Sequence, residues 1–376
     1  MILAGARVLL PDGEAAAIEI ADGRIARVFD AVPAGDTDLG GGWLVPGFID
    51  TQVNGGGGVL FNDAPNIDGI TAIAAAHRRF GTTGLLPTLI SDDVGVVEQA
   101  ISSVDAAIAA GVPGILGIHI EGPFLNAGKR GIHDAVKFRT LDDAAIALLT
   151  RPGRGARLVT IAPELAPPGA IRALTEAGVI VAAAHSLADY AQTRAALDEG
   201  LAGFTHLFNA MTGLGSREPG MVGAALDDKR SLFGLIVDGH HVAPATMRVA
   251  LAARGTDGAM LVTDAMPPAG TDLRSFDLMG RTITVADGTL RGADGTLAGS
   301  ALTMAEAFRN AISLLHVDMH AASQLASANP ARFLGLAGET GRIAPGLRAD
   351  FVHLDDDLRV IGTWIGDDYS PSGERR

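Results

Sequence analysis

The sequence predicts a (β/α)8 barrel of the TIM type, with a small β-sandwich domain formed by both chain termini. Apolar strand patterns alternate with Ala-rich helical patterns through the middle of the chain, and eight such strand patterns occur there. Both ends are instead rich in short strand-like segments separated by turn residues. We therefore expect a composite β domain over residues 1–46 and 336–376, and a barrel domain over residues 47–335.

The eight central strands are each a short apolar run followed by a helical pattern, such as 94–110, 170–177 or 188–199. The predicted strands span residues 45–53, 84–91, 115–121, 158–163, 179–185, 203–207, 232–238 and 259–264. Pro87 counts against a regular ladder in the second strand, because proline cannot donate a hydrogen bond. After the eighth strand, two Asp-Gly turns within residues 281–297 predict an inserted hairpin.

The two chain ends share a different pattern, in which turns interrupt short β-like segments. These segments span residues 4–10, 16–20 and 24–29 near the start, and 341–344, 351–354 and 360–364 near the end. Their similarity suggests one β domain assembled from both termini. The polar residues 369–376 are expected to be disordered.

The composition limits the classes of partner. The chain has 376 residues, no cysteine and a formal net charge of −14. This charge repels phosphate backbones, so we expect no nucleic-acid partner. No run of 18 apolar residues and no signal-peptide pattern is present, so we expect no membrane partner. The lack of cysteine fits a cytoplasmic protein.

Polar residues of one chemical kind follow several predicted strands. Glu121, His185 and His206 end the third, fifth and sixth strands, and the active site of a barrel lies at these carboxyl ends. A single histidine after a strand is more often a structural residue, but three ligand-type residues at such ends predict a metal site. One carboxylate and two imidazoles suit one divalent ion, Zn²⁺ above all, although Fe, Co, Mn or Cd fit the same ligands.

Asp264, at the end of the eighth strand, has the placement of a general base. A carboxylate beside a metal site takes a proton from water whose pKa the metal lowers. The alternative is that Asp264 caps the segment 265–268, since aspartate is a good N-cap residue.

Loops after the third, sixth and seventh strands hold candidates for binding an anion. These are Lys129, Arg130, His133, Asn209, Arg217 and His241. Arginine binds phosphate in two-pronged fashion, but a single surface arginine is usually only solvated, and His133 is equally well a plain loop residue. The glycine run 55–58 lacks the spacing of a dinucleotide-binding loop, so we expect no nucleotide there.

Several motifs resemble those of the N-acetylglucosamine-6-phosphate deacetylases of the amidohydrolase superfamily. They include Pro-Gly-Phe-Ile-Asp at 46–50, His-Ile-Glu-Gly-Pro-Phe at 119–124, Thr-His-Leu-Phe-Asn-Ala-Met at 205–211, Arg-Glu-Pro-Gly at 217–220, Asp-Gly-His-His at 238–241 and Val-Thr-Asp-Ala-Met at 262–266. They follow the family's order and extend over almost the whole chain.

The resemblance implies a role for each matching residue. The metal ligands would be Glu121, His185 and His206. Asp264 would activate the water and later protonate the leaving amine, while His133 would contact the substrate and polarise its acetamide carbonyl. The sugar phosphate would be held by Asn209, Ala210, Arg217 and His241. The resemblance further implies hydrolysis of N-acetylglucosamine 6-phosphate to glucosamine 6-phosphate and acetate, by a homodimer with phosphate sites near its interface.

One departure from the wider superfamily concerns the end of the first strand. Many amidohydrolases carry His-x-His there, whereas this chain has Gln52 and Asn54. Neutral amides are poor ligands for a transition metal, so we predict a single-metal site.

Three alternatives stay open from the sequence. One is an N-acetylgalactosamine-6-phosphate deacetylase, because pocket shape sets the preference at sugar C4. Another is a dihydroorotase-like cyclic amide hydrolase, although Ala-Pro-Glu at 162–164 stands where a bridging lysine would follow the fourth strand. The last is a non-catalytic binding protein on an enzyme scaffold.

Overall fold

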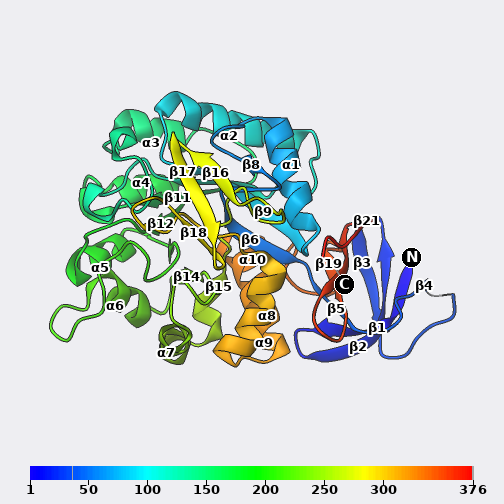
Figure 1. Cartoon of the computed structure of the whole chain (residues 1–376). Helices are drawn as coiled ribbons and strands as arrows, with labels where there is room; N and C mark the ends of the chain where they lie inside the picture. Colours follow the sequence, from blue (N-terminus) through cyan, green and yellow to red (C-terminus); the bar gives the residue numbers. More distant parts are fainter. Residues whose placement is uncertain (36, 375–376) are drawn as a thin grey trace.

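The computed structural model describes residues 1–35 and 37–374. Figure 1 shows a barrel ringed by helices, with a separate β sheet beside it that contains both chain termini. The predicted barrel with a β domain from both ends is therefore confirmed. Within the described residues, no helix is both long and apolar enough to cross a membrane.

Parallel strands form the barrel, and each pairs with the next along the chain. They are β6 (Phe48–Val53), β9 (Thr82–Ile90), β10 (Gly117–Glu121), β11 (Ala156–Ile161), β12 (Ile180–Ala183), β13 (Gly203–Phe204), β14 (Leu232–Leu235) and β15 (Ala259–Leu261). Helices cover the outside of the barrel (Figure 1). They are α1 (Ile67–Arg78), α2 (Val94–Ala109), α3 (Asp143–Leu149), α4 (Ala170–Glu176), α5 (Tyr190–Asp198), α6 (Gly220–Asp227), α7 (Pro244–Arg254) and α8 (Met304–Leu315). The chain continues through α9 (Met319–Ser323) and α10 (Asn329–Phe333).

The barrel closes between its first and last strands at their carboxyl ends. Val53 forms a parallel bridge with Ala265, just beyond β15. The backbone N–H of Asp264 donates to the carbonyl of Gln52 at 3.0 Å, and that of Asn54 donates to Ala265 at 2.9 Å. This closure brings residues at the ends of β6 and β15 side by side.

The predicted first strand, 45–53, is wrong as a single element, because the structure divides it between two sheets. β5 (Trp43–Pro46) belongs to the terminal sheet, and β6 to the barrel. Gly47 lies between them, where a Cβ atom would be only 2.1 Å from Thr83 Oγ1. The close approach requires glycine, and the chain changes sheet there.

The second barrel strand accommodates Pro87 through an irregular register. The pairing of β6 with β9 shifts between Asp50 and Val53. The backbone N–H of Val53 then donates to Thr88 Oγ1 at 2.8 Å instead of to a strand carbonyl. The hydroxyl of Thr88 therefore accepts a hydrogen bond from the backbone N–H that has no strand partner in the shifted register.

The terminal sheet has the order β21-β20-β19-β5-β1-β2-β3. Its strands are β1 (Ile2–Leu10), β2 (Gly13–Ala21), β3 (Arg24–Phe29), β5, β19 (Phe351–Leu354), β20 (Val360–Ile365) and β21 (Asp368–Pro371), and β4 (Thr37–Asp38) pairs with β1. Its own apolar core includes Ile18, Ile20 and Phe351. The segment 341–344 was expected to be β-like, but it is not a strand.

The expected disorder of the tail is wrong for most of its length. β21 pairs with β20, and the rings of Tyr369 and Trp364 lie 4.5 Å apart between their centroids. An aromatic cross-strand pair of this kind stabilises an edge strand that would otherwise fray. Residues 375–376 lie outside the described part of the chain.

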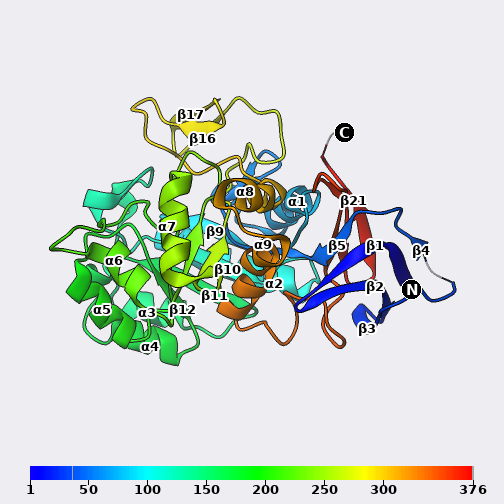
Figure 2. The ribbon, with the colours of Figure 1, turned by 90° about the horizontal axis from the view of Figure 1, so that it is seen from below.

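A small antiparallel sheet is inserted after β15 and lies at one end of the barrel (Figure 2). The predicted hairpin corresponds to β17 (Arg281–Ala286) and β18 (Thr289–Arg291), and the structure adds β16 (Ser275–Leu278). Its apolar residues share a small core with side chains of the barrel mouth. That core contains Leu60, Ile90, Met266, Leu278, Ile283, Leu290 and Ala298. Leu60 belongs to β8 (Val59–Leu60), which pairs with β7 (Gly55–Gly56).

Candidate active site

A cavity of about 680 Å³ opens at the carboxyl ends of the barrel strands. Its walls come from the strand ends, from the loop between β10 and β11, and from the inserted sheet. Residues predicted from the sequence that line it are Glu121, Lys129, Arg130, His133, His185, His206, Asn209, Ala210, His241 and Asp264. The structure therefore gathers almost every candidate residue around one cavity.

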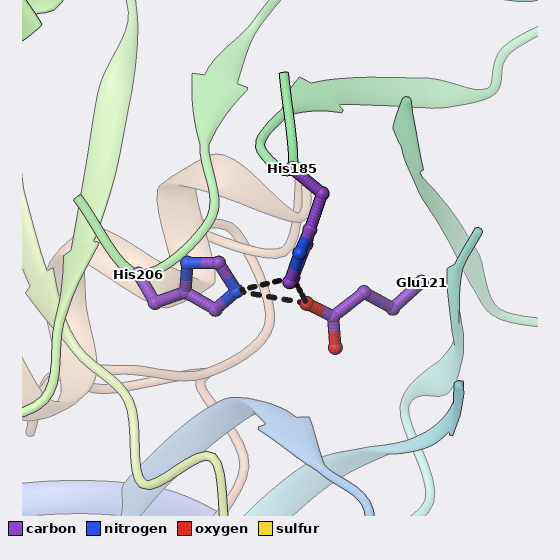
Figure 3. A group of neighbouring side chains, drawn as sticks. All are labelled: Glu121, His185 and His206. Atoms are coloured by element: carbon purple, nitrogen blue, oxygen red, sulfur yellow. Dashed lines mark hydrogen bonds and ion pairs between the residues drawn. The ribbon is translucent and has the colours of Figure 1, made fainter. Parts of the chain in front are cut away.

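Glu121, His185 and His206 meet at the base of this cavity, with their donor atoms directed at one point (Figure 3). Glu121 Oε1 lies 3.1 Å from His185 Nε2 and 2.9 Å from His206 Nε2. The two Nε2 atoms are 3.1 Å apart. Donors on one tetrahedral ion, bound at ~2.0–2.1 Å, lie about 3.3 Å from each other. The three side chains thus fit a divalent metal ion with little movement.

The backbone at these strand ends is unusual. His185, His206 and Asp264 have φ angles of 49°, 35° and 52°, in the left-handed region that non-glycine residues rarely adopt. Such strained residues concentrate at functional sites. Here the left-handed turn ends each strand and directs its side chain into the barrel mouth.

Hydrogen bonds orient the imidazole of His185. Its Nδ1 lies 2.9 Å from the carbonyl of Lys129, which only accepts, so Nδ1 carries the hydrogen. Nε2 then presents its lone pair towards Glu121 and His206, as a metal ligand requires. Burial alone would raise the pKa of Glu121, but the neighbouring imidazoles of His185 and His206 hold the pKa of this carboxyl well below its usual value.

Asp264 lies beside the triad, and amide groups hold one of its oxygens. Asp264 Oδ1 accepts from Gln52 Nε2 at 3.0 Å and from Asn54 Nδ2 at 2.7 Å. Burial, together with the charge of Glu121, raises the pKa of Asp264 to about 6. No helix begins at the segment 265–268, so the N-cap alternative has no support. A carboxylate with this pKa is suited to exchanging a proton near neutral pH.

His133 is buried in the cavity wall as a neutral imidazole. Its Nδ1 accepts from the backbone N–H of Ser91 at 3.3 Å, so the ring hydrogen belongs on Nε2. Burial and the neighbouring His185 lower the pKa of His133 to about 3, which keeps the ring uncharged at neutral pH. The rings of His133 and His185 are 4.5 Å apart between centroids. A neutral N–H donor therefore lies next to the triad.

The predicted phosphate-binding residues divide into two groups. Asn209, Ala210 and His241 line the cavity, and His241 Nδ1 lies 2.6 Å from the carboxylate of Asp238. Arg217 is exposed and does not line the cavity, so the structure does not bring it to the site of its own chain. Arg291, at the end of β18, does line the cavity and was missed. Its place in an insertion after the last barrel strand is the signal that could have indicated it.

The comparisons with known proteins agree with this geometry. Residues 43–372 match the model of the amidohydrolase family. The chain is 43% identical over 373 residues to an N-acetylgalactosamine-6-phosphate deacetylase of Shewanella sp. strain ANA-3, covering 97% of this chain and 94% of the relative. It is 38% identical over 343 residues to an N-acetylglucosamine-6-phosphate deacetylase of Homo sapiens, covering 87% and 83%.

A solved structure supports the same relationship. The crystal structure of N-acetylglucosamine-6-phosphate deacetylase from Pasteurella multocida superposes with a TM-score of 0.95 at 30% identity, covering 99% of each chain. The match therefore extends over the barrel and the terminal sheet together. This chain belongs to the amidohydrolase family and is a metal-dependent amidohydrolase.

Proposed function

We propose that this enzyme hydrolyses N-acetylglucosamine 6-phosphate to glucosamine 6-phosphate and acetate, in amino-sugar metabolism. The observation that carries the proposal is the meeting of Glu121, His185 and His206 beside Asp264 in one cavity. Relatives named as deacetylases of acetylated amino-sugar phosphates, at 33–43% identity, support this choice of substrate.

We infer that Glu121, His185 and His206 hold one divalent metal ion, with Zn²⁺ as the preferred ion and Fe, Co, Mn or Cd as substitutes. When bound, such an ion supplies Lewis-acid chemistry that polarises the acetamide carbonyl and makes a water molecule acidic. The amides of Gln52 and Asn54 stand where a second metal would need imidazole ligands, which supports a single ion.

Asp264 and His133 carry the proton and charge steps in this proposal. Asp264 removes a proton from the attacking water, and later gives it to the nitrogen of the departing amine. His133 donates its Nε2–H to the carbonyl oxygen as negative charge develops there, which stabilises the transition state. The neutral state of His133 and the raised pKa of Asp264 support these roles.

We propose that Asn209, Ala210 and His241 bind the sugar phosphate from within the chain. Arg217 is exposed and lies outside the cavity wall, so we propose that it serves the cavity of a second subunit in a homodimer. The exposed Leu214 on the same loop, with 59% of its surface accessible, supports a subunit contact there.

A second candidate substrate is N-acetylgalactosamine 6-phosphate. The observation that favours it is the 43% identity to the Shewanella enzyme, which carries that name. The two sugars differ only in the configuration at C4, and the same triad and base would serve both. The pocket around C4 would then decide the preference.

We also propose the domain limits stated above, with a terminal β domain over residues 1–46 and 336–376 and a catalytic barrel over 47–335. The separate apolar core of the terminal sheet supports this division. A cytoplasmic location is proposed from the absence of cysteine.

The test is acetate release from both sugar phosphates and from unphosphorylated N-acetylglucosamine, before and after chelation and metal restoration. We expect metal-dependent release from the phosphorylated sugars only, with a higher kcat/KM for the gluco epimer. A higher kcat/KM for the galacto epimer would replace the substrate with the second candidate. Equal rates with the unphosphorylated sugar would remove the phosphate roles of Arg217 and His241.

A further inference from the structure

Gln52 lies between the two carboxylates of the site and donates to both. Its Nε2 is 3.1 Å from Glu121 Oε2 and 3.0 Å from Asp264 Oδ1. Glu121 uses its other oxygen, Oε1, towards His185 and His206. One amide group therefore links the proposed metal ligand to the proposed base.

Asn54 adds a second donor to the same oxygen of the base. Its Nδ2 lies 2.7 Å from Asp264 Oδ1, while no described residue donates to Oδ2. Both amide side chains are fully enclosed, with about 1% of their surface accessible. Asp264 is thus held at one oxygen by two buried amides, and its other oxygen has no donor from the described chain.

The orientation of both amides follows from their neighbours. An ionised carboxylate only accepts hydrogen bonds, so the amide nitrogen and not the oxygen must face Glu121 and Asp264. The carbonyl oxygens, Gln52 Oε1 and Asn54 Oδ1, find no partner among the described residues. Buried unpaired acceptors are unfavourable and rare, so each such case calls for an explanation. The amide N–H groups compensate for this cost, because they lie between the like-charged carboxylates of Glu121 and Asp264 and reduce their repulsion.

We propose that Gln52 and Asn54 are positioning residues for Asp264, whose Oδ1 they fix so that Oδ2 alone exchanges the proton with water and amine. Gln52 has the additional task of holding Glu121 and Asp264 at a set separation, in place of a bridging cation. This inference rests on the proposed function. It gives a function to Gln52 and Asn54, which the sequence had indicated only as poor metal ligands.

The first test replaces Asn54 with leucine, which is close in shape but has no donor. Asn54 donates a hydrogen bond to Asp264 but none to Glu121 or the histidines of the triad, so we expect kcat to fall about 10- to 100-fold. KM and the metal affinity, measured by competition with a chelator, should stay within twofold. In an Asp264→Asn background the same change should have no further effect on kcat, because there is no base left to position.

The second test is Gln52→Met, which removes the donor shared by both carboxylates. We expect a similar fall in kcat together with a 10- to 100-fold weaker metal affinity, because Glu121 loses its bond as well. The metal titration requires no substrate turnover. A matched control is Asn329→Leu, a buried amide whose Nδ2 donates to the carbonyls of Thr256 and Ala259. It should lower the melting temperature without changing kcat of the metal-loaded enzyme.

Three results would overturn the inference. One is an Asn54→Leu enzyme with normal kcat and a raised KM, which would make Asn54 a substrate contact. Another is a further loss in the Asp264→Asn background, and the third is unchanged metal affinity in Gln52→Met. If the wild-type enzyme itself released no acetate, the proposed function would fail instead. The metal titration would then still decide whether Gln52 supports Glu121.

Discussion

The proposed role of Asp264 as the base predicts a lower pH limit for the reaction. Burial and the charge of Glu121 raise the pKa of Asp264 to about 6, and a base is active only when deprotonated. The active form is therefore lost as the pH falls through about 6. We expect kcat/KM to decline about tenfold per pH unit below that value. The measurement is a pH profile of kcat/KM with the metal content determined at each pH.

The matched variant for this profile is Asp264→Asn, which keeps the shape of the side chain. It should lower kcat by about 10³-fold or more, in the manner of a lost catalytic base, while retaining the metal. The pKa of His133 is lowered to about 3, so His133 does not change its charge between pH 5 and 8 and should not affect the profile there. If the remaining activity of Asp264→Asn still fell below pH 6, the pH dependence would belong to a group other than Asp264.

The residues that the sequence could indicate are those that act from strand ends. Glu121, His185 and His206 lie at the carboxyl ends of the third, fifth and sixth strands, and a parallel barrel brings all such ends to one face. The roles proposed for Gln52 and Asn54 could not be predicted in this way. Their contacts with Asp264 depend on how β6 closes against the segment after β15, a long-range feature without a local pattern.

At the scale of elements, the inserted sheet is attached to the cavity wall by Arg281. Its guanidinium donates to the carbonyl of Ile132, in the loop between β10 and β11 that also holds His133. We expect Arg281→Ala to raise KM roughly tenfold, because the loop that lines the cavity loses this hydrogen bond to the inserted sheet. A tenfold rise corresponds to ~1.4 kcal/mol of binding free energy. kcat should change little, because Asp264, the triad and His133 keep their own hydrogen bonds. Steady-state kinetics on the phosphorylated sugar measure both constants.

A control for this variant is Arg27→Ala in the terminal sheet. Arg27 forms an exposed ion pair with Glu19, far from the insertion in sequence, and 72% of its side chain is accessible. Exposed pairs contribute little, so KM and stability should stay near the wild-type values. An Arg281→Ala enzyme with unchanged KM would mean that the insertion does not help to bind substrate.

The elements that were predicted correctly are those with a strong local pattern. Barrel strands and α2, α4 and α5 follow apolar periodicity, and, except for the first strand, these elements begin and end within three residues of their predicted limits. The errors occur where tertiary contacts decide. One apolar run is divided between two sheets at Gly47, where Thr83 lies too close to the backbone for any side chain. β21 is ordered because Tyr369 packs on Trp364, although its own sequence is polar.

At the scale of the whole molecule, the proposed homodimer accounts for the position of Arg217. The chain carries a net charge of −14, so binding a phosphate requires local cations. Lys129, Arg130, Arg291 and His241 line the cavity, but Arg217 lies on an exposed loop outside it. In the proposed homodimer, Arg217 would bind the phosphate in the cavity of the other subunit, and the two sites would be related by twofold symmetry.

Mixing two inactive enzymes tests this arrangement. Arg217→Ala should raise KM, so that little activity remains at low substrate, and Asp264→Asn should lower kcat by about 10³-fold or more. If Arg217 acts across the interface, each hybrid dimer contains one cavity with both an intact Asp264 and an intact Arg217. Random reassociation of equal amounts should then restore roughly a quarter of wild-type activity. If Arg217 serves its own chain, every cavity in the hybrid has a defect, and the mixture stays as inactive as its components.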